Sequence, residues 1–268
     1  MRDPELTVLV TVYHKIAPAD LQASLESIRT QTVQPADVVV VEDGPLPTTL
    51  RSVLDSFPDL RRFSLAKNQG AALASQRGLT EVRTPWLARQ DADDISLPTR
   101  FERQLAAARA LEVDVLGTAV LEFDANPDNP TAVRALPTDH ESIRRYARFN
   151  SPLNNPSLLI RTEAIRAVGG YRDVTYQEDY DLTIRLLAAG YRFHNLPEPL
   201  VKFRVTRDQF ARRKDPRLAA SERTIQRTLV ETGLISRPRA VVNYLVRNAY
   251  RQLPSHVMVA AYRRLFHR

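Results

Sequence analysis

The chain has 268 residues, of which 43% are hydrophobic and 26% are charged, and its formal net charge is +7. These proportions are typical of an ordinary globular protein, and the length fits one large α/β domain with a small appendage. There is no cysteine, which excludes disulfides and thiolate metal sites and suits a reducing cytoplasm. No segment approaches the ~18 consecutive apolar residues that a bilayer-spanning helix needs.

The positive charge is concentrated at the C-terminal end. Residues 233–268 contain seven arginines and neither aspartate nor glutamate, which leaves the rest of the chain close to neutral. The body therefore needs no polyanionic partner to explain its charge. Aromatic residues suited to stacking on single-stranded bases are sparse, so we expect no nucleic-acid binding.

Strand and helix patterns alternate through the first hundred residues. The first apolar run, Leu6–Val12, lacks the pattern of a signal peptide, so we expect it to be a strand. Valine-rich runs predict strands at 6–12 and 37–41, and further strands are expected at 61–65 and 86–90. Apolar residues at helical spacing predict helices at 19–29, 48–57 and 70–82. This alternation predicts a doubly wound, mostly parallel sheet, which binds ligands beyond the carboxyl ends of its strands.

The pattern changes after Pro98. We expect helices at 101–111, 140–149, 162–168 and 178–189, and strands at 113–123, 157–161, 191–196 and 200–204. After Pro238 two further helical segments are expected, separated by Pro254, and the second combines an apolar stripe with basic residues. The chain therefore divides into a main domain at 1–205 and, at 206–268, a flexible basic segment with C-terminal amphipathic helices.

Acidic residues gather at the ends of two predicted strands. Asp43 follows "VVVVE", and Asp91, Asp93 and Asp94 follow "WLARQ". Carboxylates this close repel one another unless a cation intervenes, and Mg²⁺ or Mn²⁺ uses one or two carboxylates together with phosphate oxygens and water. One interpretation is a metal–diphosphate site at the mouth of the sheet. The other is that Asp43 forms a turn, while Asp94 and Ser96 cap the next helix and the remaining acids are solvated.

A second acidic motif, "QEDYDL", begins the helix predicted at 178–189. The helix dipole favours the charged form of Asp179, which would then be ready to accept a proton at neutral pH. Acids are also common at helix starts, so Glu178, Asp179 and Asp181 have a purely structural explanation as well.

The segments "VLVTVYHK", "VVVVEDGP", "AKNQGAALASQ", "RQDADDISLP" and "GGYRDVTYQEDYDL" together stand in the order and spacing of one family. From about Leu6 to Val205 the chain resembles the family 2 glycosyltransferases of the GT-A fold, which are inverting, nucleotide-sugar-dependent enzymes. It is similar to bacterial exopolysaccharide and O-antigen transferases of the amylovoran-biosynthesis type. The resemblance implies an α/β fold with a Rossmann-like, mostly parallel central sheet flanked by helices, a nucleotide-sugar half at about 1–100, an acceptor half at about 101–205 and a C-terminal helical appendage.

The resemblance also assigns roles to individual residues. Asp93 would hold Mg²⁺ or Mn²⁺ on the diphosphate, Asp179 would be the general base that deprotonates the acceptor hydroxyl, and Glu178 would position the acceptor. The nucleotide-sugar site would comprise Thr11, Tyr13, Asp43, Asn68, Gly70 and Asp91. One departure is Asn155, which precedes Pro156 where many relatives have histidine and which cannot act as a titrating base.

The implied donor is a nucleotide-diphosphate sugar, with uridine as the family's usual nucleoside. The implied acceptor is a bacterial surface glycan, including one carried on a polyprenyl lipid, which fits a cytoplasmic enzyme lying peripherally on the inner membrane. The composition of the last basic helix suits binding to an anionic membrane surface. It equally suits packing against the body of the protein or against a second subunit. The basic segment with Arg144, Arg145 and Arg148 fits a lipid diphosphate, or equally a solvated helix face.

The sequence is also weighed against two other functions. A nucleotidyltransferase also uses a doubly wound sheet and paired acids, but it would show a glycine-rich, basic loop after the first strand, and "TVYHKIAPAD" has no glycine. A catalytically inactive membrane-surface scaffold would share the fold but would not need to keep Asp91, Asp93 and Asp179.

Overall fold

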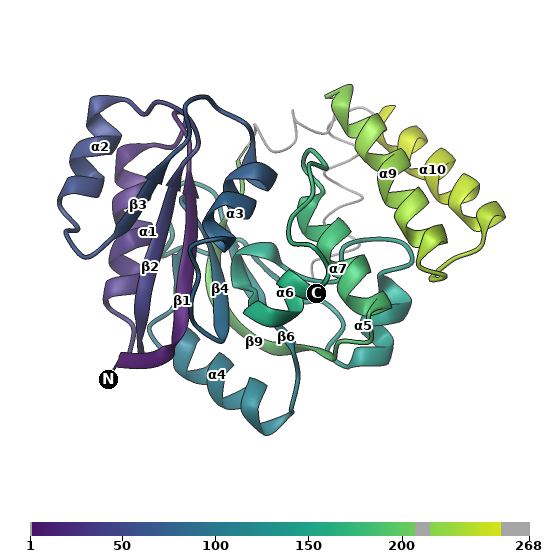
Figure 1. Cartoon of the computed structure of the whole chain (residues 1–268), viewed down its shortest axis with the longest axis horizontal. Helices are drawn as coiled ribbons and strands as arrows, with labels where there is room; N and C mark the ends of the chain where they lie inside the picture. The colour runs from purple at the N-terminus through teal and green to yellow at the C-terminus, as the bar shows by residue number, and fades with distance from the viewer. Residues whose placement is uncertain (1, 207–214, 253–268) are drawn as a thin grey trace.

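A nine-stranded mixed β-sheet runs through the protein, whose computed structural model describes residues 2–206 and 215–252 (Figure 1). The strand order is β3-β2-β1-β4-β8-β6-β9-β5, and β7 pairs with β6 outside this path. The strands are β1 (Arg2–Val12), β2 (Gln34–Glu42), β3 (Arg61–Ser64), β4 (Trp86–Asp91), β5 (Ile95–Ser96), β6 (Val115–Phe123), β7 (Ala132–Arg134), β8 (Leu159–Arg161) and β9 (Phe193–Arg204).

Helices cover both faces of this sheet. They are α1 (Pro18–Arg29), α2 (Thr48–Asp55), α3 (Ala71–Leu79), α4 (Arg100–Ala110), α5 (His140–Tyr146), α6 (Thr162–Ala167), α7 (Glu178–Ala188), α9 (Arg217–Glu231) and α10 (Arg237–Gln252), with a 3-10 turn η1 (Asn155–Ser157). The apolar residues of α1, α2 and α4 form one core, and those of α3, α5, α6, α7 and α9 form the other.

Strand β1 shows why the sheet is buried on both sides. Leu6, Val8 and Val10 belong to the core under α1, α2 and α4, whereas Leu9 belongs to the opposite core. Side chains alternate between the two faces of a strand, so a strand covered on both faces becomes apolar at nearly every position. This is the pattern that the valine-rich runs predicted.

The sheet has a parallel half and a mixed half. Strands β3, β2, β1 and β4 are mutually parallel, as predicted, and Thr11 lies opposite both Val41 of β2 and Asp91 of β4. Strand β8 then runs antiparallel to β4 and β6, while β9 pairs in parallel with β6. The parallel register brings the carboxyl ends of β1, β2 and β4 to one edge, where the predicted acids lie.

Several elements differ from the sequence prediction. The short strands β5 and β7 were not expected, because two or three residues carry no periodicity. The two strands predicted at 191–196 and 200–204 form the single strand β9, whose register shifts beside Ala119 and Val120 accommodate the intervening prolines. The segment predicted as flexible and basic contains the ordered helix α9. The last predicted helix, at 254–268, lies outside the described residues.

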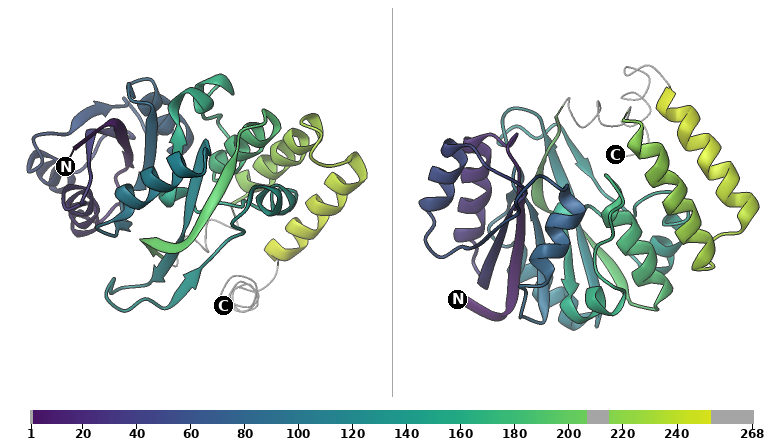
Figure 2. Two further views of the ribbon diagram at one scale, coloured as in Figure 1. Left: turned by 90° about the horizontal axis from the view of Figure 1, so that it is seen from below. Right: turned by 45° about the horizontal axis from the view of Figure 1, so that its top comes forward.

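Helices α9 and α10 form a pair at one end of the molecule (Figures 1 and 2). Their shared interior contains the fully buried Glu222, which accepts hydrogen bonds from Arg247 Nη1 (3.0 Å), Arg251 Nη2 (2.6 Å) and Gln226 Nε2 (2.8 Å). Gln177 Nε2, immediately before α7, also donates to Glu222 at 3.3 Å. One carboxylate thus joins both C-terminal helices to the start of α7. No helix within 2–206 and 215–252 is long and apolar enough to cross a membrane.

We expect Glu222→Ala to destabilise the protein by about 3 kcal/mol, because two half-buried guanidinium groups would lose their fully buried carboxylate. Urea unfolding followed by circular dichroism would measure the loss. The matched control is Glu26→Ala, which removes the exposed 2.6 Å ion pair with Arg29 and should change stability by less than about 0.5 kcal/mol. Equal effects of the two substitutions would contradict the assignment of Glu222 as a structural anchor.

Candidate active site

The candidate site lies at the edge of the sheet where β1, β2 and β4 end, at the top of Figure 1. Thr11 is opposite Asp91 in the β1–β4 ladder, and the backbone N–H of Asp43 donates to the carbonyl of Val12 at 2.7 Å. The half-buried Tyr13 follows directly after β1, with its ring edge-on to that of His14 at 5.8 Å between centroids. The residues predicted from three separate strand ends therefore share one edge.

Asp43 is buried and clamps the loop that precedes α3. Its carboxylate accepts hydrogen bonds from the backbone N–H groups of Gln69 (2.7 Å) and Gly70 (2.9 Å), and Asn68 Nδ2 donates to its carbonyl at 3.1 Å. Gly70 has φ +91°, which favours glycine, and it precedes the first turn of α3. Asp43, Asn68 and Gly70 are thereby brought together, and the free N–H groups of that first turn form an electropositive helix end.

Gly44 permits this clamp. Its φ is +86°, and a β-carbon on it would lie 2.5 Å from the backbone nitrogen of Asn68 and 2.9 Å from the carbonyl carbon of Lys67. Both neighbours are backbone atoms, so no side-chain movement could relieve the contact. Only glycine allows the loop after β2 to approach the loop before α3 so closely.

A buried polar network holds the turn between β4 and β5 in place. The fully buried Arg100 donates to Gln90 Oε1 (2.8 Å), to Ser96 Oγ (2.9 Å) and to the carbonyl of Arg89 (2.7 Å). Ser24 Oγ of α1 donates to the carbonyl of Asp91 at 2.9 Å. Burial lowers the pKa of Arg100 to about 9, which leaves the group cationic at neutral pH.

The acids of this turn have different surroundings. Asp94 is buried and accepts from the backbone N–H of Arg204 at 2.8 Å, and its pKa is raised well above the usual range by burial and by Asp93 and Asp91. Asp93 is half-buried, and burial followed by the charge of Asp91 raises its pKa to about 6. The capping alternative is wrong, because α4 has Thr99 at its N-cap without a side-chain cap.

Arg89 is a buried cation that the sequence analysis read only as a strand residue. Its side chain is 2% exposed, with Nη2 donating to Asp91 Oδ1 and Nη1 to the carbonyl of Leu9, both at 3.3 Å. A charged residue inside the apolar run "WLARQ" was the available signal, because buried arginines are rarely without an acidic partner.

Glu178 and Asp179 stand at the first turn of α7, and the charge of Arg89 acts on both. Burial, followed by the charge of Asp179, raises the pKa of Glu178 to about 8; burial also raises the pKa of Asp179 to about 6, with the charge of Asp91 acting in the same direction. Arg89 lowers the pKa of both groups. Asp91, from the parallel half of the sheet, and the two acids of α7 therefore belong to one electrostatic cluster around Arg89.

The pKa values of this pair are shifted in the direction opposite to that of the helix dipole, although Asp179 is still ionised at neutral pH, as expected. Burial outweighs the dipole and raises both pKa values, so that at neutral pH Glu178 keeps its proton while most of Asp179 is ionised. Asp181, in the same motif, has the structural role: it is fully buried and paired with Arg172 and with Arg185 Nε (2.8 Å). The motif thus combines one structural acid with two acids that face the site.

Tyr171 is a second residue that the sequence analysis did not identify. It is buried, and its hydroxyl has no hydrogen-bond partner among the described residues. Burial raises its pKa to about 12, with Glu178, Asp179 and Asp91 adding to the increase. Its backbone N–H donates to Gln76 Oε1 of α3 at 2.7 Å, which joins the loop before α7 to α3.

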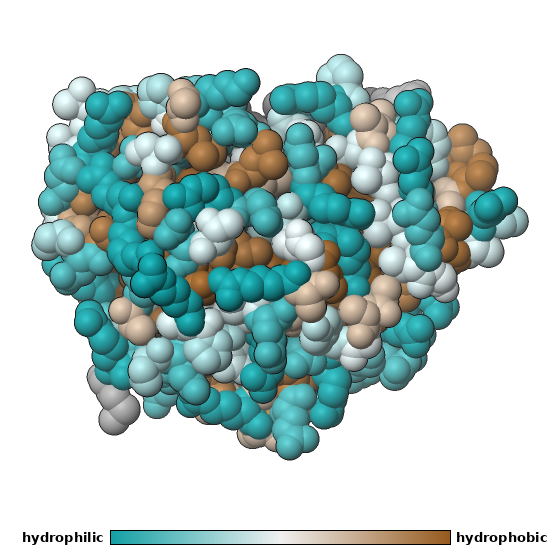
Figure 3. Space-filling view, in the orientation of Figure 1, coloured by the Kyte–Doolittle hydropathy of each residue, from teal (hydrophilic) through white to brown (hydrophobic). Residues whose placement is uncertain are grey.

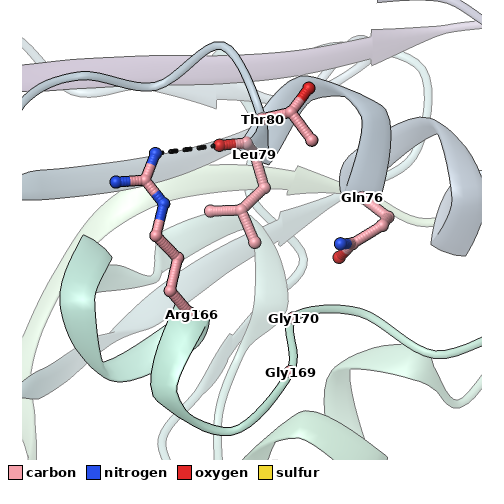
Figure 4. A pocket seen from close by; sticks show the side chains of 6 residues that line it. All are labelled: Gln76, Leu79, Thr80, Arg166, Gly169 and Gly170. Atoms are coloured by element: carbon pink, nitrogen blue, oxygen red, sulfur yellow. Dashed lines mark hydrogen bonds between the residues drawn. The ribbon is translucent and has the colours of Figure 1, made fainter.

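A pocket of about 230 Å³ lies between α3 and α6 (Figure 4). Arg166 projects beside it and donates to the carbonyl of Leu79 at 3.3 Å. The pocket is lined by Gln76, Leu79, Thr80, Arg166, Gly169 and Gly170. None of the predicted site residues lines it, so it is separate from the carboxylate cluster.

The residues present fit a hard divalent cation with few protein ligands. Within the described ranges, no three histidine, aspartate or glutamate side chains gather in a way that would hold a metal by themselves. Asp91 and Asp93 nevertheless supply carboxylate oxygens, and their negative charges repel each other. Mg²⁺ commonly takes one or two carboxylates and completes its shell with substrate phosphates and water.

Four of the residues discussed above belong to the region expected on the acceptor side. Arg144, Arg145 and Arg148 are exposed. Asn155 opens η1, and its Oδ1 is buried without a partner among the described residues.

Comparison with protein families gives two overlapping matches. Residues 7–169 match the model described as glycosyl transferase family 2, and residues 91–263 match the model described as glycosyl transferase family group 2. Together they span the strand-end acids, the α7 acids and the C-terminal helices.

Individual proteins resemble the chain over nearly its full length. The amylovoran biosynthesis glycosyltransferase AmsE of Erwinia amylovora is 33% identical over 96% of this chain and 97% of its own. The UDP-Gal:alpha-D-GlcNAc-diphosphoundecaprenol beta-1,3-galactosyltransferase of Escherichia coli is 31% identical over 99% of this chain and 98% of its own.

Solved structures share the fold. S. aureus TarS 1–349 in complex with UDP-GlcNAc superposes with a TM-score of 0.68 at 17% identity, covering 91% of this chain and 72% of that one. The mannosyltransferase PcManGT from Pyrobaculum calidifontis, in complex with GDP-Man and Mn²⁺, gives 0.62 at 17% identity, covering 98% and 80%.

We expect Glu178→Gln to stabilise the protein at high pH and to have little effect at low pH. The raised pKa means that the folded state binds this proton more tightly than the unfolded state does, so stability is lost as pH rises from about 4.5 to about 8. A neutral glutamine removes that loss. Unfolding temperatures at pH 5 and pH 9 would measure it, with the exposed Glu163→Gln as control. The same shift at both pH values would contradict the raised pKa.

Proposed function

Because the chain belongs to the family 2 glycosyltransferases, we propose that it transfers one sugar from a UDP-sugar to a bacterial surface-glycan acceptor, with inversion and with a divalent cation. The observation that supports this proposal is that Asp91, at the end of β4, is paired with Arg89, and that the charges of both act on Glu178 and Asp179 at the start of α7. Donor-side and acceptor-side acids come from distant parts of the chain and influence one another's charge.

The donor would lie along the edge formed by β1, β2 and β4. Asp43 would receive the nucleoside base, and the loop that it clamps would present Asn68 and Gly70 to the nucleotide and its phosphates. Thr11 and Tyr13 would line the nucleotide pocket at the end of β1, and Asp91 would approach the ribose or the sugar.

A Mg²⁺ or Mn²⁺ ion held by Asp93, beside Asp91, would offset the negative charge of the departing diphosphate.

The acceptor would be activated by Asp179. Its ionised carboxylate takes the proton from the acceptor hydroxyl while that oxygen attacks the anomeric carbon, and the bond to the nucleoside diphosphate breaks on the opposite face. Glu178, which keeps its proton at neutral pH, would donate a hydrogen bond that positions the acceptor. One displacement inverts the anomeric centre, and no covalent nucleophile is required.

The names of the similar proteins support the substrate classes. The E. coli relative is named for a UDP-galactose donor and a diphosphoundecaprenol-linked acceptor, and the solved structures contain UDP-GlcNAc, or GDP-Man with Mn²⁺. We extend these to a uridine nucleotide, a polyprenyl-linked acceptor and a peripheral position on the cytoplasmic face of the inner membrane, with contact through the C-terminal helices. Family membership argues against a nucleotidyltransferase. An inactive scaffold would show no donor turnover with any acceptor.

We expect Asp93→Ala to abolish the metal-dependent part of donor binding. Thermal-shift measurements with UDP-sugars, with and without Mn²⁺, would show the wild type stabilised most by the two ligands together, because a ligand that binds only the folded state raises its stability. The variant should lose the additional shift due to Mn²⁺. The exposed Asp59→Ala serves as control. An unchanged Mn²⁺-dependent shift in Asp93→Ala would remove Asp93 from the metal site.

We expect Asp179→Asn to reduce transfer at least about 100-fold while donor binding is retained, because an amide cannot accept the acceptor's proton and general-base catalysis contributes on this scale. Transfer would be measured by product formation, and donor binding by the same thermal shift. Asp173→Asn, at an exposed position in the loop before α7, is the control. Full turnover in Asp179→Asn would show that the base is another group.

A further inference from the structure

Helix α10 is arranged with its apolar side toward solvent. Val241, Val242, Leu245 and Val246, here called the α10 face, are between 51% and 61% exposed. They are half of the large hydrophobic residues exposed in the described part of the chain. Figure 3 shows hydrophobic colour at the right-hand edge, where Figure 1 places α10.

The opposite side of α10 is polar and packs against the body. Asn243 is buried and donates to the carbonyl of Arg148 (2.9 Å) and to Gln226 Oε1 (3.3 Å). Arg247 donates to Glu222 (3.0 Å) and to Asn150 Oδ1 (2.8 Å). A surface helix usually buries its apolar stripe. Polar contacts anchor this helix instead, so its attachment leaves the α10 face uncovered by the described residues.

Exposed arginines lie at the start of α10 and beside Phe149. Arg239 lies over the ring of Phe149 at 4.2 Å from the centroid, and Phe149 is itself 49% exposed. Arg148, next to Phe149, is exposed, as is Arg237 at the start of α10. The chain from 233 to 268 contains no acid. Exposed aliphatic residues with an aromatic ring and arginines beside them match the two requirements of an anionic bilayer surface, apolar insertion and positive charge.

We propose that the α10 face, with Phe149 and its neighbouring arginines, docks the enzyme on an anionic phospholipid surface. The proposal rests on the proposed function, because a lipid-carried acceptor would be met at such a surface. The docking helix is tied to the catalytic helix: Arg247 binds Glu222, and Glu222 accepts from Gln177, the residue before Glu178. The acceptor's lipid and its reacting hydroxyl would thus be received by elements connected through buried hydrogen bonds.

The test compares full-length protein with the double variant V242D/L245D in vesicle flotation. Vesicles of phosphatidylglycerol with phosphatidylcholine should bind the wild type, and vesicles of phosphatidylcholine alone should bind it much less. The variant should lose at least about tenfold in partition coefficient, because two apolar side chains become charged at the contact. Raised ionic strength should weaken the binding of the wild type.

The control is V133D/L111D, the same pair of substitutions at exposed positions of β7 and the end of α4 (39% and 41% exposed), which should bind vesicles like the wild type. Unchanged vesicle binding by V242D/L245D would overturn the proposal. A wild-type dimer in light scattering that the variant converts to monomer, without vesicle binding, would assign the face to a second copy. A larger fall in unfolding temperature than in the control, with vesicle binding retained, would assign it to residues 253–268.

Failure of the docking surface and failure of the proposed function give different results. Transfer to a short-chain, water-soluble acceptor should be the same in the wild type and V242D/L245D, since the α10 face takes no part in the chemistry. If the wild type binds anionic vesicles but transfers no sugar to any acceptor, the proposed function is wrong while the docking surface stands.

Discussion

The contact between Arg89 and Asp91 is the interaction on which the site depends. The negative charge of Asp91 raises the pKa of Asp93, Glu178 and Asp179, as repulsion between like charges at a partly buried site requires. The guanidinium of Arg89 is bonded to Asp91 and lowers the pKa of both acids of α7. Because it is buried, its charge is screened by water far less than that of a surface arginine.

This arrangement requires both halves of the sheet. The parallel half supplies Arg89 and Asp91 at the end of β4, and apolar residues of the mixed half share a core with α7, which carries Glu178 and Asp179. The antiparallel strand β8 joins the halves by pairing with β4 on one side and β6 on the other. Supporting networks lie behind each part: Arg100 under the β4–β5 turn, and Glu222 behind the start of α7.

The amino-acid sequence predicted most of the elements, the family and the GT-A fold, which the comparisons confirm. Strand-end acids such as Asp43 and Asp91 were predictable because parallel strands end at a common edge. Arg89 and Tyr171 were not identified, since their importance depends on burial and on neighbours far away in the chain. Helix α9 was missed although its buried residues Leu218, Ile225 and Leu229 stand at helical spacing, because the segment was interpreted from its basic charge alone. The outward orientation of α10 could not be predicted, because amphipathic spacing gives two faces but not which of them packs.

The clamp formed by Asp43 has a kinetic consequence. Both oxygens of its carboxylate already hold the backbone of Gln69 and Gly70, so the loop before α3 has its shape before any ligand arrives. At the donor site proposed here, a nucleotide sugar would then lose little entropy in ordering that loop. Encounter between enzyme and nucleotide sugar should accordingly be limited by diffusion and by the approach of an anion to a helix end, and not by a slow rearrangement of the receiving backbone.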